Sequence, residues 1–185
     1  MVQEKKPLRL PHVGLRNLKT ALSATLCALV YFLFLPDRNP AFACIGAIFG
    51  MGADMESSKL GGGNRLFGTI LGGFLGMGLY SLYLLFYPDG GHHLLLVFFL
   101  FVGVIILILL AQWLWVGAVQ PGGVVLCLLL FSIGPDNYIV YCLDRILDTA
   151  IGVVMSLTIN FLLPRERVLR WWEALRGLVR RGKPQ

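Results

Sequence analysis

The chain has 185 residues, of which 57 % are hydrophobic and only 14 % are charged, and its mean hydropathy is +0.75. A soluble globular domain carries about 25 % charged residues, so this composition argues against one and indicates an integral membrane protein. The formal net charge of +6 indicates membrane topology and affinity for an anionic inner leaflet; it does not imply nucleic-acid binding.

Six apolar segments follow one another along the chain and predict an all-α protein with six transmembrane helices, because about 20 apolar residues span the hydrocarbon core. Turn-forming residues separate them, including the Ser- and Gly-rich stretch 57–64, which we interpret as a break. The break between the fourth and fifth segments is the least distinct, so five spans are the alternative. The segments cover about residues 15–35, 40–53, 66–87, 93–114, 116–133 and 138–163. We expect no cleavable signal peptide, because the first segment is long enough to span.

Lysine and arginine predict the orientation. With six spans, fourteen of the 16 basic residues fall on one side and only Arg38 and Arg145 on the other. This asymmetry places both termini in the cytoplasm and the protein in the inner (plasma) membrane. Residues 1–13 then form a basic cytoplasmic segment, 14–164 the membrane domain, and 165–185 a basic amphipathic helix on the inner leaflet. A contact with a soluble partner or a second copy is the alternative for that tail.

One helix face occurs twice, 80 positions apart, as an arginine, a threonine and two small residues at i, i+4, i+7 and i+11. Its copies are Arg65, Thr69, Gly72 and Gly76, and Arg145, Thr149, Gly152 and Ser156. The repeat divides the membrane domain into halves at about 14–90 and 91–164. Three spans in each half make the second half enter from the opposite side, which predicts a 3+3 inverted repeat of the kind found in transporters. A chance match among glycine-rich helices is the alternative.

The two arginines are the strongest candidates for contact with an anionic substrate, since arginine stays charged and grips a carboxylate with two hydrogen bonds. Thr69 and Thr149, one turn further on, could donate hydroxyl hydrogen bonds to the same anion. Alternatively, Arg65 and Arg145 are interfacial anchors or members of structural ion pairs. Lys19 belongs either to a positive vestibule that concentrates anions or to an ordinary positive-inside flank.

Two acids are candidates for proton transfer or for ion pairing. Asp148 lies three residues after Arg145, and Asp54 directly follows the second segment. An unpaired Asp148 would be neutral in a low-dielectric setting and could carry a proton, whereas a structural pair with a basic residue is the alternative. The four cysteines match no metal or redox spacing and are interpreted as small apolar residues, so we expect no metal and no cofactor.

Four stretches together resemble the aromatic acid exporter family, within the wider fusaric acid resistance (FUSC) group of bacterial membrane proteins. They begin at Gly14 (GLRNLKTALSATLCALVY), Asn39 (NPAFACIGAIFGM), Gly61 (GGGNRLFGTILGGFLG) and Asp144 (DRILDTAIGVVMSLTINFLLP). The resemblance covers about residues 14–164, and plant aluminium-activated malate transporters are more distant relatives. It implies a dimeric six-helix domain that moves organic anions out of the cell along a pathway lined by basic residues. Longer family members carry a cytoplasmic domain after the last span, where this chain has about 20 residues.

We therefore expect a homodimeric transporter or channel that exports organic anions, for example aromatic carboxylates, along a pathway with arginines at both mouths. The chain contains no nucleotide-binding motif, so the membrane potential or proton exchange would drive transport. The alternative is a non-transporting scaffold that docks a soluble partner through the basic tail. An enzyme acting on lipid phosphates is disfavoured, because no cluster of residues suits nucleophilic or metal chemistry.

Overall fold

The computed structural model describes residues 14–91 and 93–164, and these form six α-helices and one short 3-10 helix, with no β-strand among them. The helices are α1 (Leu15–Phe34), α2 (Ala41–Gly50), α3 (Met55–Phe86), α4 (Leu95–Leu114), α5 (Val119–Phe131) and α6 (Tyr138–Leu162), with η1 (Val116–Ala118) preceding α5. The predicted basic segment 1–13 and amphipathic tail 165–185 lie outside the described residues.

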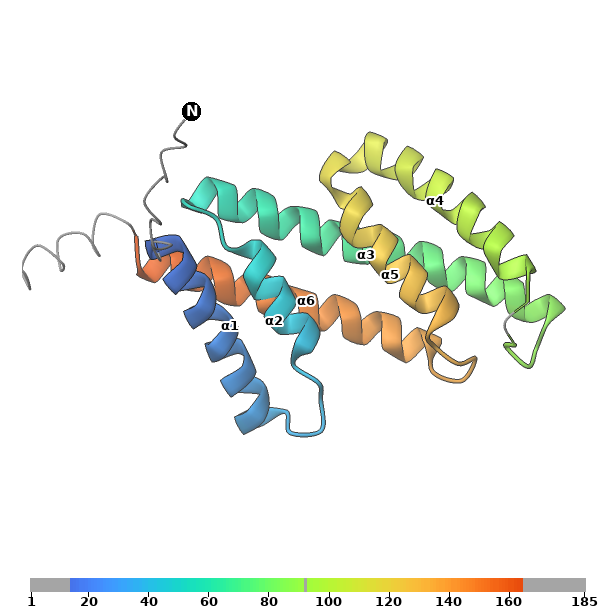
Figure 1. The fold of residues 1–185 in the computed structure, drawn as a ribbon, viewed down its shortest axis with the longest axis horizontal. Coiled ribbons are helices and arrows are strands. Elements are labelled where there is room, and N and C mark those ends of the chain that lie inside the picture. Colours follow the sequence, from blue (N-terminus) through green and yellow to red (C-terminus); the bar gives the residue numbers. More distant parts are fainter. Residues whose placement is uncertain (1–13, 92, 165–185) are drawn as a thin grey trace, which may run out of the picture.

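Helices α3 and α6 form an antiparallel central pair (Figure 1). Near one end, Asn160 of α6 reaches Ser58 of α3, and near the other Tyr138 of α6 meets Ser81 of α3. The hairpin of α1 and α2 lies toward one end of this pair, and the hairpin of α4 and α5 toward the other. Helix α2 packs mainly against α6, and α5 mainly against α3. Each short helix therefore packs against the long helix of the other predicted half.

Helix lengths support four of the six predicted transmembrane helices. Four helices, α1, α3, α4 and α6, are long and apolar enough to cross a membrane, with 20, 32, 20 and 25 residues. Helices α2 and α5 have 10 and 13 residues, so at 1.5 Å per residue they cover only about 15–20 Å of the roughly 30 Å hydrocarbon core. The predicted boundary between the fourth and fifth segments is confirmed, because α4 ends at Leu114 and Trp115 is extended.

The expected break at residues 57–64 is wrong, because α3 is continuous from Met55. Asp54 caps its first turn by accepting from the Ser57 backbone, and the Ser57 hydroxyl in turn accepts from the Asp54 backbone. This reciprocal capping box starts a helix before any apolar run begins. Arg65 therefore lies ten residues inside α3 and not at its mouth, and Arg145 lies seven residues inside α6.

Glycines on the long helices allow the short helices to approach closely. A Cβ added at Gly72 would overlap the carbonyl group of Gly122 on α5, and one added at Gly152 would overlap the carbonyl oxygen of Ala43 on α2. Small residues commonly permit such backbone contact between membrane helices. These glycines therefore serve helix packing within the molecule.

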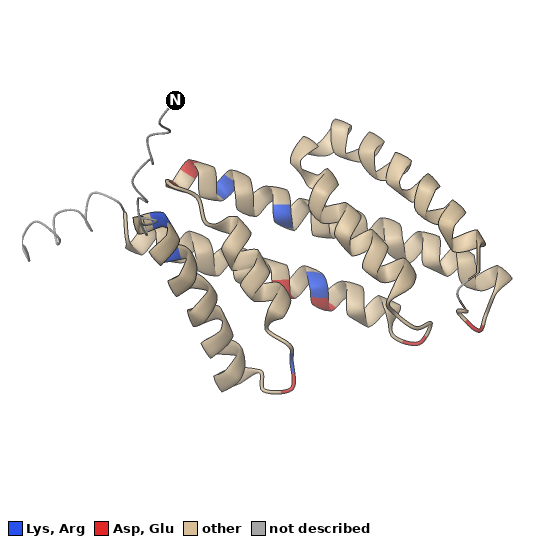
Figure 2. Ribbon diagram, viewed as in Figure 1, with Lys and Arg blue, Asp and Glu red and all other residues tan. Residues whose placement is uncertain are grey.

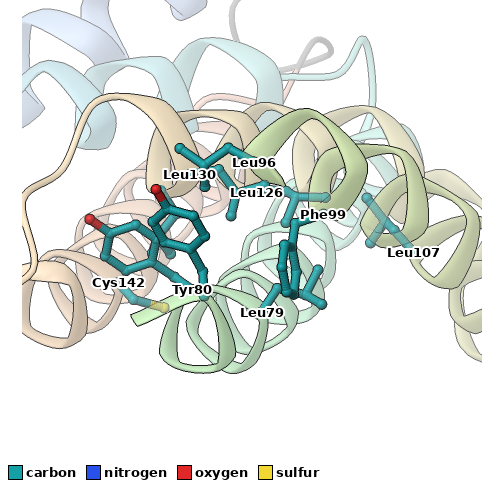
Figure 3. Packing of buried hydrophobic residues seen from close by; sticks show 10 residues of the cluster. Leu79, Tyr80, Leu96, Phe99, Leu107, Leu126, Leu130 and Cys142 are labelled. Atoms are coloured by element: carbon teal, nitrogen blue, oxygen red, sulfur yellow. The ribbon is translucent and has the colours of Figure 1, made fainter. Parts of the chain in front are cut away.

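The largest apolar core lies where α3, α4, α5 and α6 meet (Figure 3). Tyr80, Leu107 and Leu126 are at most 1 % exposed there, and Cys142 is fully buried beside them. Cys27 is buried and Cys44 half-buried, whereas Cys127 is exposed on the apolar outer face of α5. Large side chains such as Phe101 and Trp113 are also exposed, as expected of a lipid-facing surface.

Candidate functional site

The two copies of the repeated face meet at the centre of the molecule. The hydroxyl oxygens of Thr69 and Thr149 lie 3.5 Å apart, and both side chains are at most 1 % exposed. The Thr69 hydroxyl donates to the carbonyl oxygen of Arg65, one turn earlier, at 2.9 Å. The threonines thus belong to the packed contact between α3 and α6, with an arginine to either side of it along the central pair.

Asp148 is the centre of an ionic cluster on the α6 side. Its Oδ1 accepts from the Tyr31 hydroxyl at 2.6 Å and from Arg38 Nη2 at 3.0 Å. Its Oδ2 lies 3.0 Å from Arg145 Nη2, a charge contact outside hydrogen-bond geometry. Asp148 itself is 0 % exposed. Two guanidinium groups and a phenol therefore surround one buried carboxylate. This arrangement agrees with the structural ion pair that the sequence offered as one of two interpretations of Asp148.

The same cluster includes a second carboxylate and two aromatic rings. Arg38 Nη2 also donates to Asp144 at 2.8 Å. The Arg145 guanidinium carbon lies 3.8 Å from the ring centre of Phe42 and 4.9 Å from that of Tyr141, within cation–π range. Two arginines face two aspartates, so the formal charges of this cluster cancel. Figure 2 shows the acidic and basic positions of α6 side by side.

Arg65 has a different environment although it is equally buried, at 8 % exposure. Within residues 14–91 and 93–164, no carboxylate lies within ion-pair distance of its guanidinium group. Its Nε, like that of Arg145, has no hydrogen-bond partner there, and the guanidinium carbon of Arg65 lies 5.6 Å from the ring centre of Phe49. A buried cation without a counter-charge costs several kcal/mol, by order of magnitude, unless a ligand supplies an anion.

Lys19 lies in a separate polar cluster near the beginning of α1. It is 5 % exposed, and its Nζ donates to Asn160 Oδ1 at 2.9 Å. The Asn160 amide donates in turn to the Ser58 hydroxyl at 2.8 Å and to the Asp54 carbonyl at 2.7 Å. Lys19 is therefore buried and connects α1 to α6 by a hydrogen bond.

Asp54 is exposed at the start of α3, where it caps the helix. Hydrogen bonds from the side chain and backbone of Ser57 lower the pKa of the Asp54 carboxyl group below its usual range. A carboxylate held ionised by capping is a poor proton carrier near neutral pH. Its geometry fits a structural role.

The described residues contain no group of three or more His, Cys, Asp or Glu side chains placed to hold a metal ion. The side chains that gather at the centre are cations, hydroxyls and aromatic rings, which can bind and orient an anion.

Five of the seven predicted site residues lie along the central pair, at the threonine contact or beside it: Arg65, Thr69, Arg145, Thr149 and Asp148. Lys19 and Asp54 lie together at one end of it. Sequence reasoning missed Tyr31, and it assigned Arg38 only to topology. Both residues are more than 100 positions from Asp148 in the chain, and no local motif connects them to it.

The comparison with protein families gives one match, and it covers most of the chain. The profile described as fusaric acid resistance protein-like matches residues 26–159. No curated protein and no solved structure matches the chain. The matched range includes both central arginines and the whole Asp148 cluster, and it begins after Lys19. The chain belongs to the fusaric acid resistance protein-like family of membrane proteins.

Proposed function

We propose that this protein moves organic monoanions, aromatic carboxylates in particular, across the inner membrane and that Arg65 is the main contact for the anion. The supporting observation is the buried guanidinium of Arg65, which has no carboxylate partner in the described part of the chain. A carboxylate ligand would supply the missing charge and two well-directed acceptors. The resemblance to aromatic acid exporters suggests the substrate class.

The pathway that we propose follows the contact between α3 and α6. Two features support an inverted repeat there: each short helix packs against the long helix of the other half, and Thr69 meets Thr149 between the halves. Short helices in matching positions of two halves are a common sign of a central transport site. In this arrangement both termini are cytoplasmic, and Arg65 lies on the cytoplasmic side of the threonines.

Arg145 would have a different role in this pathway. Asp148 already supplies its counter-charge at 3.0 Å, so a substrate carboxylate reaching Arg145 would have to compete with a resident one. Such competition weakens anion binding at the outer side, and a weakly held anion dissociates there more readily. The Asp148 cluster would thus serve as the exit side of the pathway.

The membrane potential is sufficient to drive export of a monoanion. At 100 mV it supplies about 2.3 kcal/mol per charge, which supports roughly a fiftyfold concentration ratio. Homodimerisation and the role of the tail at 165–185 stay predictions.

The test is the flux of 4-hydroxybenzoate into liposomes that contain the purified protein, under an imposed potential. We expect Arg65→Gln to lower the flux at least tenfold, because it removes a charge-assisted contact, and Arg65→Lys to restore part of it. Lys59→Gln is the matched control, since it removes an exposed cation from the same helix and should leave the flux unchanged. Equal leak in wild type, variants and empty liposomes would refute transport and favour the scaffold alternative.

A further inference from the structure

A groove of about 700 Å³ lies between α1 and α2, apart from the central threonine contact. Its walls combine polar and apolar side chains: Arg16, Asn17, Thr20, Ala21, Ala24, Ile48 and Phe49. Pockets of roughly 300–1,000 Å³ hold small organic ligands. The groove is therefore large enough for one substituted benzoate.

The polar side chains of the groove gather at one end. Arg16 and Asn17 are exposed in the first turn of α1, whereas Ala24 lies two turns further on beside α2. The Thr20 hydroxyl is engaged with the Arg16 carbonyl at 2.9 Å, so the arginine and the asparagine are the side chains that can meet a ligand. Helix α1 contains no Asp or Glu, and no carboxylate of the described residues pairs with Arg16. The charge of this end suits an anion.

Phe49 connects the groove to the buried arginine. Its side chain lines the groove, and its ring centre lies 5.6 Å from the guanidinium carbon of Arg65. It is 63 % exposed and stands in the last turn of α2. One aromatic ring therefore contacts Arg65 and also forms part of the groove wall.

We propose that the groove between α1 and α2 is a binding site through which aromatic monocarboxylates reach Arg65. Arg16 and Asn17 hold the carboxylate, Ile48 and Phe49 contact the aromatic ring, and displacement of the Phe49 ring passes the ligand to Arg65. This proposal rests on the proposed transport function. It adds a binding site and the order in which the anion meets Arg16 and then Arg65.

Binding is tested first, without any flux measurement. The probe is 4-benzoylbenzoate, a photoreactive aromatic carboxylate, applied to the full chain in phosphatidylcholine nanodiscs, with cross-linked peptides mapped by mass spectrometry. We expect labelling of α1 and α2, competition by 4-hydroxybenzoate, and about a tenfold loss of labelling in Arg16→Gln. Lys59→Gln should label as wild type does. Uncharged benzophenone should show no dependence on Arg16.

Three results would overturn the site. Equal labelling of α1 and α2 in wild type and Arg16→Gln would mean that the probe only partitions into an apolar surface and that the groove does not recognise its carboxylate. Cross-links confined to other helices would place binding elsewhere. Displacement of the probe by phosphatidylglycerol but not by 4-hydroxybenzoate would assign the groove to a lipid headgroup.

Flux measurements separate this proposal from the transport function. We expect Arg16→Gln to raise the half-saturating concentration of 4-hydroxybenzoate about tenfold with the maximal rate kept, because access weakens while Arg65 is intact. We expect Arg65→Gln to lower the maximal rate instead. Flux with wild-type saturation in Arg16→Gln would refute the groove and leave transport standing. Arg16-dependent labelling without any flux would retain the site and refute transport.

Discussion

Arg65 and Arg145 occupy the same place in the two copies of the repeated helix face, yet their electrostatic environments differ. Each lies one turn before the threonine contact and is less than a tenth exposed. Position 148, three residues after Arg145, is an aspartate, whereas position 68, three residues after Arg65, is a glycine. The neighbours differ in the same way, since Asp144 precedes Arg145 and Asn64 precedes Arg65.

These two differences give the two arginines different partners. Asp144 and Asp148 pair with Arg38 and Arg145. Asn64 instead accepts a hydrogen bond from the Trp115 indole at 2.5 Å, and no carboxylate of residues 14–91 and 93–164 pairs with Arg65. The repeated framework thus contains one neutralised end and one positive end. In the pathway that we propose, an anion binds more strongly beside Arg65 than beside Arg145, while the membrane potential sets the direction of net flux.

The largest effect should come from removing the buried carboxylate. We expect Asp148→Ala to lower the free energy of unfolding by about 3–5 kcal/mol, because Arg38 and Arg145 lose their shared buried partner. Asp148→Asn should cost less, since the amide oxygen can still accept from the Tyr31 hydroxyl. The measurement is equilibrium unfolding in mixed micelles followed by circular dichroism. Asp37→Ala, which removes an exposed carboxylate beside Arg38, is the control. Wild-type stability in Asp148→Ala would contradict the account of this cluster.

The helix packing of the two halves should be equivalent although their charges are not. We expect Gly72→Ala and Gly152→Ala each to lower the free energy of unfolding by about 1–3 kcal/mol, because the new methyl group meets the backbone of α5 or α2. Gly78→Ala is the control, since no heavy atom lies within 4 Å of its added Cβ. A large loss of stability at only one of the two glycines would show that the contact of α3 with α5 and the contact of α6 with α2 are not equivalent.

The sequence predicted most of the helices and the central residues, because long apolar runs and the 80-residue repeat are local signals. It failed at residues 57–64, where glycines that look like a break serve close packing instead. A Cβ at Gly62, for example, would overlap Val153 of α6, which no single-sequence pattern reveals. It also left open whether Asp148 is paired, since Arg38 is 110 positions away in the chain.

A smaller effect is expected from giving the Arg65 end an acid of its own. The direct mimic, Gly68→Asp, would overlap Pro121, so Asn64→Asp is the better test. It keeps the shape and the acceptor for Trp115, and it adds a negative charge near Arg65. We expect about a fivefold loss of 4-hydroxybenzoate flux, because a charge on the half-buried side chain at position 64 is only partly screened from Arg65. Asn137→Asp, an exposed change of the same kind at the start of α6, should leave the flux unchanged, and a normal flux in Asn64→Asp would argue against Arg65 as the main anion contact.

The converse change, Asp144→Asn, should have the smallest effect. The pair of Asp144 with Arg38 is partly exposed, at 38 % and 30 %, so its loss should cost at most about 1 kcal/mol of stability. Asp148 still neutralises Arg145 at 3.0 Å, and we therefore expect the flux to stay within about twofold of wild type in the liposome assay. A rise as large as the fall in Asn64→Asp would mean that acids beside either arginine limit transport equally. The two ends would then be equivalent anion contacts, as the sequence repeat alone predicts, and the pairing of Arg145 with Asp148 would not weaken anion binding at its end.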